Sequence, residues 1–325
     1  MAKSDVHPVH TFRSWQVWPG SYDNPEADGN YPLAPNCLPE FDKATPITSM
    51  GSCFAREIKN VLIREGYNYV NEEPGHPASK HAGAAWERLY NTFSMRQIFE
   101  YTFAEFKPLT RWWVSPLSNM IQDPYRRIIL YDSIDDAERD FQHHVECSRS
   151  ALTKSRLIII TLGLTEVWES RTDGSVICLP AGPYVNEGGD MTDYDFRVTR
   201  FQENLANLER IYSLLSEQNP EANLVVTVSP VHLWATFRQD EDVISASCNS
   251  KSTLRAVADE FVGRHENVFY FPAYEMASIY RPMMGASIYA EGRENFHVNQ
   301  DVVDFIMRQF FKAAGSPKNV HELEG

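Results

Sequence analysis

The chain has 325 residues, 43% of them hydrophobic, and a formal net charge of −14. This length exceeds that of a typical domain, yet one α/β domain with insertions accommodates it. The sequence has no apolar run of about 18 residues and no apolar leader, so we expect a cytoplasmic protein without a membrane span. The acidic balance argues against nucleic-acid binding, because phosphate contacts need clustered Lys and Arg.

The cysteines and histidines give no sign of a metal or redox centre. The five cysteines are widely spaced and form no C-x-x-C pair, which predicts reduced thiols. The doublet His143-His144 lacks the i, i+4 partner typical of a helical metal site, so we expect a solvated pair. The sequence therefore implies no metal and no cofactor.

The predicted organisation is an arm, one main domain and a short tail. Residues 1–44 mix Pro, Asn and aromatic residues without periodicity and are expected to pack on the main domain, with a disordered tail as the alternative. The main domain is predicted over 45–315, with lid insertions near 71–131 and 171–196. A tail follows at 316–325.

Strands and helices alternate along the main domain. Short apolar runs predict strands at 46–50, 156–163, 223–229 and 267–271. Helical spacing of apolar residues predicts helices at 54–65, 134–150, 201–215 and 251–265, two helices over 86–106, and a last helix capped by Asn299. This alternation calls for a mainly parallel sheet with right-handed crossovers.

The run Gly51-Ser52-Cys53-Phe54-Ala55 lies where the first strand ends and the first helix begins. A serine on such a turn points out of the sheet edge, and the first N–H groups of the helix can stabilise a developing oxyanion. Ser52 is therefore the predicted nucleophile for acyl transfer. The alternative is that Ser52 is only the N-cap of the helix.

Cys53 is a rival nucleophile in the same turn. A thiol at a helix N-terminus has its thiolate favoured and can attack an acyl carbon. We expect the neighbouring side chain to point elsewhere, however, and cysteine is commonly a small buried hydrophobe.

The motif also resembles the signature of the GSCFA family, which is grouped with the SGNH (GDSL-like) hydrolases. Later blocks follow the family's pattern in order: Tyr90-Asn91-Thr92, Ile160–Glu166, Val226–Val231 with Ser250-Lys251 and Leu254-Arg255, and Tyr270–Glu275. This resemblance covers about residues 45–300. It implies a three-layer α/β/α sandwich with a flavodoxin-like sheet and ester or acyl chemistry at the sheet's C-terminal edge.

A serine nucleophile needs a base, and the base needs an orienting group. Glu294 and His297 are spaced like the D-x-x-H block of SGNH hydrolases, so the resemblance implies that they complete a triad with Ser52, with Glu in place of Asp. His232 follows a predicted strand and is an alternative base or a pocket residue.

The resemblance also points to oxyanion donors. It places them at the Ser52 N–H and at the block containing Gly163, where Thr165 replaces the usual Asn. Asn91 is expected to supply the missing amide from a neighbouring loop. Glu166 follows directly and is expected to border the pocket, with a surface acid as the alternative.

Lys251 and Arg255 lie four residues apart on one predicted helix face. They are expected to pair with surface carboxylates, or alternatively to bind an acidic substrate. The whole pattern predicts a serine-dependent esterase that acts on a small or carbohydrate-like acyl ester through an acyl-enzyme. The alternatives are an O-acyltransferase with the same site and a binding or assembly module that keeps the fold. The sequence leaves the oligomeric state open.

Overall fold

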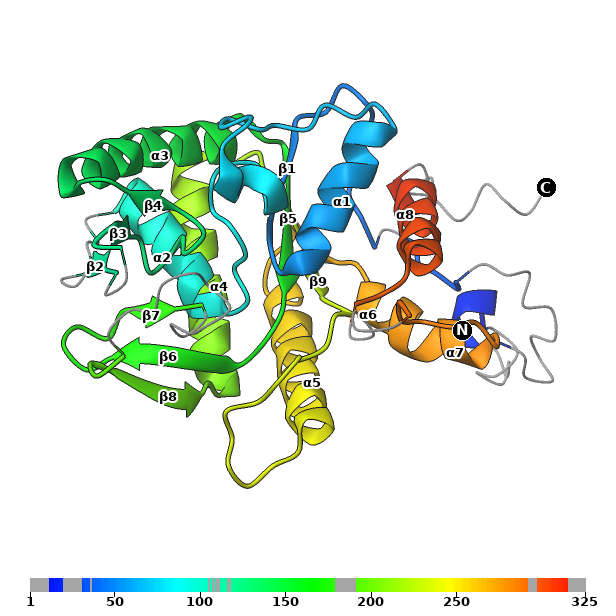
Figure 1. Ribbon diagram of the computed structural model, residues 1–325. Coiled ribbons are helices and arrows are strands. Elements are labelled where there is room, and N and C mark those ends of the chain that lie inside the picture. The colour runs from blue at the N-terminus through cyan, green and yellow to red at the C-terminus, as the bar shows by residue number, and fades with distance from the viewer. Residues whose placement is uncertain are drawn as a thin grey trace, which may run out of the picture.

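A parallel four-stranded sheet forms the centre of the molecule (Figure 1). The computed structural model describes residues 12–19, 31–35, 37–104, 106, 108, 112–115, 118–178, 191–291 and 297–314. The sheet has the order β1-β5-β9-β10, and its strands are β1 (Ile47–Gly51), β5 (Leu157–Leu162), β9 (Asn223–Val228) and β10 (Val268–Tyr270). All of its neighbouring strands run parallel, which confirms the predicted α/β class.

Helices cover both faces of this sheet because its strands are apolar on both sides. In β5, Ile158 and Ile160 pack on one face, and Leu157 and Ile159 on the other. The first face is covered by α2 (Thr92–Phe103), α3 (Ile134–Lys154), α4 (Phe201–Gln218) and α5 (Val243–Val262). The second is covered by α1 (Cys53–Arg64), α6 (Ala273–Glu275), the π-helical segment Met276–Tyr280 and α8 (Gln300–Ala314). The short α7 (Arg281–Met283) continues the π-helical segment. The result is the three-layer arrangement that the sequence predicts.

Polar caps set where most long helices begin. Ser133 begins α3 and Asp242 begins α5, each accepting backbone N–H bonds. Asn299 accepts from the Val302 N–H at the start of α8, as predicted. The two helices predicted over 86–106 are wrong: only α2 forms, and its cap is Asn91. Residues 86–90 do not form a helix because their backbone bonds elsewhere, as in the 2.7 Å bond from the Leu89 N–H to the Gly51 carbonyl of β1.

Two small antiparallel sheets lie beside the helices. One consists of β2 (Trp113–Val114), β3 (Ile121–Gln122) and β4 (Leu130–Tyr131), and the other of β6 (Glu166–Ser170), β7 (Val176–Ile177) and β8 (Tyr194–Val198). The region 171–196 is thus less irregular than predicted, because β8 pairs with β6 from Ser170 to Glu166. Residues 179–190 lie outside the described part of the chain.

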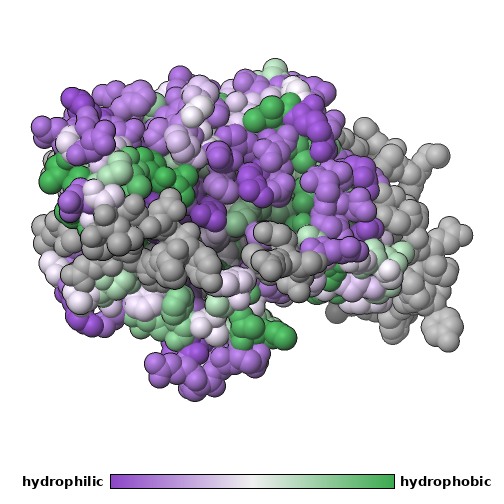
Figure 2. All heavy atoms as spheres, in the orientation of Figure 1, coloured by the Kyte–Doolittle hydropathy of each residue, from purple (hydrophilic) through white to green (hydrophobic). Residues whose placement is uncertain are grey.

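The segment before β1 contacts the second face of the core. Tyr31 makes an edge-on ring contact with Tyr280 at 5.4 Å, and Phe41 contacts Phe310 at 5.2 Å. The visible surface is largely hydrophilic over α3 (Figure 2). Among the described helices, none is both long and apolar enough to cross a bilayer.

Candidate active site

The turn from β1 into α1 requires glycine at its first position. Gly51 has φ of +131°, and a Cβ there would lie 2.3 Å from the Thr161 carbonyl oxygen on the neighbouring strand β5. Because L side chains rarely adopt this backbone and have no room here, only glycine fits. The close approach lets the Ser52 N–H donate to Thr161 Oγ1 at 2.8 Å, which ties the start of α1 to β5.

Ser52 is the N-cap of α1. Its Oγ accepts a hydrogen bond from the Phe54 N–H at 3.2 Å and lies 3.0 Å from Thr161 Oγ1. The residue is only 2% exposed. No described histidine bonds to this hydroxyl, so the geometry matches the capping role that the sequence offered as the alternative.

Cys53 has the histidine contact that was expected for the serine, and it also contacts a tyrosine. Its Sγ lies 3.1 Å from the Tyr90 hydroxyl and is hydrogen-bonded to His297. Burial acts to raise the pKa of the thiol, but the bonds to His297 and Tyr90 and the charge of Arg88 outweigh it, so the pKa lies below its usual value. The expectation that this side chain points elsewhere is wrong, since it is Cys53, at the first position of α1, that contacts the histidine.

Two residues of the segment before α2, Tyr90 and Arg88, shape the charge around this thiol. Burial raises the pKa of Tyr90 well above its usual range, so the phenol stays neutral and its O–H can donate to a thiolate. The guanidinium of Arg88 bonds to Glu87 Oε1, with its Nη2 at 3.0 Å. Glu87 has a positive φ of 57°, and its N–H donates to the Ala78 carbonyl at 2.9 Å. A backbone held in this sparsely populated region is frequent at functional sites.

His297 reaches the site from a short bridge before α8. Tyr289 pairs with Val298, and the Ala290 N–H donates to the His297 carbonyl at 2.9 Å. This pairing places the histidine beside the start of α1. Glu294, the predicted orienting acid, lies outside the described residues.

At the C-terminal edge of the sheet, Gly163 packs against Tyr90, the residue before Asn91. The Tyr90 carbonyl accepts the N–H groups of Gly163 at 3.2 Å and Leu164 at 2.7 Å, and a Cβ on Gly163 would lie 2.7 Å from that same oxygen. Asn91 is 1% exposed, and its Oδ1 accepts the Ser94 N–H. Its Nδ2 has no acceptor in the described part of the chain. A buried amide donor without an acceptor in the described structure, on the residue that follows Tyr90, has the chemistry of an oxyanion donor.

Two other predicted residues, Thr165 and Glu166, have structural partners. Thr165 Oγ1 lies 2.8 Å from Ser250 Oγ on α5. Glu166 accepts the Thr236 hydroxyl at 2.6 Å and pairs with Arg238 at 3.3 Å, so it anchors the loop after β9. These bonds occupy both side chains with partners on α5 and on the loop after β9.

His232 lies after β9 and contacts α5. Its Nδ1 is 2.8 Å from Ser247 Oγ, and its ring packs edge-on against Tyr289 at 5.5 Å. Burial, followed by the charge of Lys251, lowers its pKa, so the ring stays neutral near pH 7. No described contact joins it to Cys53 or Ser52, whereas His297 bonds to Cys53.

Two expectations about charged side chains are wrong. Lys251 is fully buried rather than paired at the surface, while Arg255 does pair with Glu275 at 2.7 Å. His144 is also buried and bonds to Glu73 at 2.8 Å, so only His143 is solvated. The described residues contain no cluster of three or more His, Cys, Asp or Glu that could bind a metal.

The sequence contained a signal for the burial of Lys251 but none for the contact between Tyr90 and Cys53. Lys251 lies three residues before Leu254 and four after Ser247, on the buried side of α5. The apolar stripe that predicts this helix therefore includes the lysine when it is extended by one turn. The contact between Tyr90 and Cys53 joins residues 37 apart, which no local pattern indicates.

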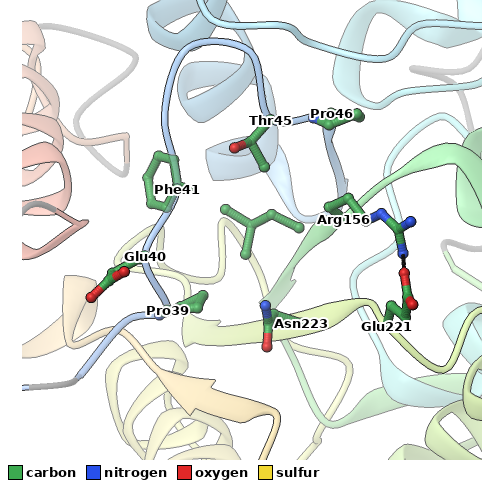
Figure 3. Close-up of a pocket in the computed structure, with 9 residues that line it drawn as sticks. Pro39, Glu40, Phe41, Thr45, Pro46, Arg156, Glu221 and Asn223 are labelled. Carbon is green, nitrogen blue, oxygen red and sulfur yellow. Dashed lines mark ion pairs between the residues drawn. The ribbon is translucent and has the colours of Figure 1, made fainter. Parts of the chain in front are cut away.

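A separate hollow lies at the opposite edge of the sheet (Figure 3). It has a volume of about 330 Å³ and is lined by Pro39, Glu40, Phe41, Thr45, Pro46, Arg156, Leu157, Glu221 and Asn223. Leu157 and Asn223 begin β5 and β9, whereas Gly51 and Gly163 lie at the strands' C-terminal ends. Ligands of open α/β sheets bind at the C-terminal ends, so the turn at Cys53 is the candidate site.

The sequence profile of the GSCFA family matches residues 46–310. The chain belongs to the GSCFA family. The match includes the turn at Cys53, the segment of Tyr90 and Asn91, the turn at Gly163 and His297. A comparison with curated proteins gives no match.

Several solved structures are similar to this GSCFA protein. A GDSL-like lipase from Parabacteroides merdae has 9% identity and a TM-score of 0.37, covering 87% of this chain and 100% of its own. A salicylyl-acyltransferase from a tetracycline biosynthetic pathway has 14% identity and a TM-score of 0.29, covering 53% of this chain and 42% of its own. A carbohydrate esterase of family 2 from Corynascus has 11% identity and a TM-score of 0.26, covering 50% of this chain and 38% of its own. The chain therefore spans less than half the length of the last two proteins. At TM-scores this low, none of these structures indicates the chemistry of this chain, and only its own site does.

Proposed function

We propose that this GSCFA protein transfers acyl groups through Cys53, with His297 as the proton carrier. The observation that carries the proposal is the position of the thiol, which starts α1 and is bonded to both His297 and Tyr90. A helix N-terminus favours a negative charge, and a thiolate is the nucleophilic form of cysteine. Ser52 lacks a base of this kind among the described residues and serves as the cap.

The reaction follows from these contacts. The Cys53 thiolate attacks the acyl carbon of an ester, a carbon–sulfur bond forms, and the carbon–oxygen bond to the leaving alcohol breaks. Protonated His297 gives its proton to the departing alkoxide. Neutral His297 then takes a proton from water or an acceptor hydroxyl, whose oxygen attacks the thioester and releases the Cys53 thiolate.

The oxyanion formed in each step needs donors. The Cys53 N–H has no acceptor within its helix because it belongs to the first turn. The Asn91 amide, buried and without an acceptor in the described structure, is a second donor of the right kind. Glu294 is retained in the proposal as the group that orients His297. The proposed substrate is a small or carbohydrate-like acyl ester, with hydrolysis as the main outcome and O-acyl transfer as the alternative fate of the same thioester.

The test is acylation by p-nitrophenyl acetate, followed by intact-mass and peptide mass spectrometry. We expect one added acetyl group on Cys53 and its loss in Cys53→Ala. Ser52→Ala is the matched control, because it changes the adjacent residue of the same turn, and it should still be acylated. Acylation that survives in Cys53→Ala and disappears in Ser52→Ala would assign the nucleophile to the serine instead.

A further inference from the structure

Lys251 is a buried cation with few partners. Its side chain on α5 is 0% exposed, and its Nζ donates to the Gly163 carbonyl at 2.8 Å. It forms no ion pair with any described residue. An ammonium group in an apolar interior is costly unless a compensating charge is nearby.

Lys59 shows what a purely structural buried lysine looks like in the same protein. It donates to two carbonyl oxygens, those of Ser79 at 2.6 Å and Ala82 at 2.8 Å. Its ammonium also lies 5.5 Å from the centre of the Tyr69 ring. Lys251 has a single carbonyl, so hydrogen bonding alone accounts for it less well than for Lys59.

A continuous chain of contacts joins Lys251 to the thiol. Its Nζ donates to the carbonyl of the Gly163–Leu164 peptide, and the N–H of that peptide donates to the Tyr90 carbonyl at 2.7 Å. The Tyr90 hydroxyl in turn lies 3.1 Å from Cys53 Sγ. A fixed Gly163 carbonyl therefore also fixes the backbone of Tyr90, whose hydroxyl contacts the Cys53 sulfur.

The charges around Lys251 also connect it with the Cys53 thiol. Burial lowers its pKa to about 7, while the charge of Cys53 acts to raise it. His232 is lowered in pKa by burial and by Lys251, so it adds no positive charge near pH 7. His297, Tyr90 and Arg88 also act on the Cys53 thiol, and each lowers its pKa.

We propose that Lys251 is a positioning residue whose ammonium is the buried counter-charge of the Cys53 thiolate. This inference rests on the proposed function of Cys53. The ammonium favours the thiolate, and the thiolate favours the ammonium, so each group ionises more readily when the other is charged. Removing either group makes the other harder to ionise.

The test measures ionisation rather than turnover. The rate of Cys53 alkylation by iodoacetamide is followed across pH by peptide mass spectrometry in wild type, Lys251→Met and Lys59→Met. We expect Lys251→Met to raise the pKa of Cys53 by about one unit and to slow its alkylation near neutral pH about tenfold. Lys59→Met should leave the profile unchanged. A folded Lys251→Met protein with the wild-type profile would overturn the inference.

A second measurement avoids changing Lys251, in case that variant does not fold. The ε-carbon of Lys251 is titrated by NMR in ¹³C-lysine-labelled wild type and Cys53→Ser. Loss of the thiolate should lower the pKa of Lys251, and identical titrations would contradict the proposal. Because neither readout needs an ester substrate, a failure of acylation by p-nitrophenyl acetate is distinguished from a failure of the Lys251 inference.

Discussion

Two cysteines of this protein lie beside a histidine, and their surroundings differ. Cys53 starts α1 and contacts His297, while Cys147 lies in the middle of α3, with its Sγ 3.4 Å from His143 Nε2. Burial, followed by the carboxylates of Glu73, Glu72 and Glu146, raises the pKa of Cys147 to about 11. A cysteine–histidine contact alone therefore does not make a nucleophile.

The difference comes from the charges that surround each thiol. Cys53 is surrounded by the N-terminus of α1, the Tyr90 hydroxyl and the Arg88 guanidinium, all of which favour an anion. Cys147 faces acidic groups, and a thiolate there would be repelled. Beside a histidine, the pKa of the thiol is thus lowered in one place and raised in the other.

The largest expected effect comes from removing the histidine that contacts Cys53. His297→Ala should lower the rate of Cys53 acylation about 10²–10⁴-fold, because proton transfer and thiolate stabilisation are both lost. The rate is measured by p-nitrophenol release at fixed pH. His143→Ala removes the histidine beside Cys147 and should leave the rate unchanged. Equal rates in wild type and His297→Ala would remove His297 from the mechanism.

The two thiols should also differ in alkylation. Near pH 7, Cys53 should react with iodoacetamide more than about 100-fold faster than Cys147, since only a small fraction of a thiol with pKa of about 11 is ionised there. The rate at Cys53 should rise with pH and level off below the usual pKa of a thiol, while that at Cys147 should still be rising. Peptide mass spectrometry follows each site separately. Similar rates for the two sites would show that their surroundings do not control their reactivity.

The smallest expected effect concerns Ser52, which supports the reactive turn. Ser52→Ala removes the cap of α1 and should lower the free energy of unfolding by about 0.5–2 kcal/mol, as N-cap losses do. Urea denaturation measures this change. Ser133→Ala removes the corresponding cap of α3 and should cost a similar amount. A Ser52→Ala protein of unchanged stability but without acylation would favour the serine as nucleophile.

Much of the fold was predictable because it depends on local patterns. The apolar run ending at Leu162 predicts β5, and helical spacing predicts α4 and α8, whose cap Asn299 was correctly identified. The helix predicted before α2 was wrong because residues 86–90 carry apolar side chains at helical spacing but bond their backbone to β1 and to Ala78. Local spacing cannot show that competing set of hydrogen bonds.

The sequence by itself determined the family, the parallel α/β core and the turn that begins at Gly51, because these follow from local periodicity and an ordered set of short motifs. Only the tertiary structure decided which side chain of that turn meets the histidine. Ser52 and Cys53 are adjacent, and the direction of each depends on where β5, Tyr90 and His297 lie in space. The burial of Lys251 was likewise decided by the packing of α5 against the end of β5, because a charged side chain is placed inside only when distant residues compensate for it.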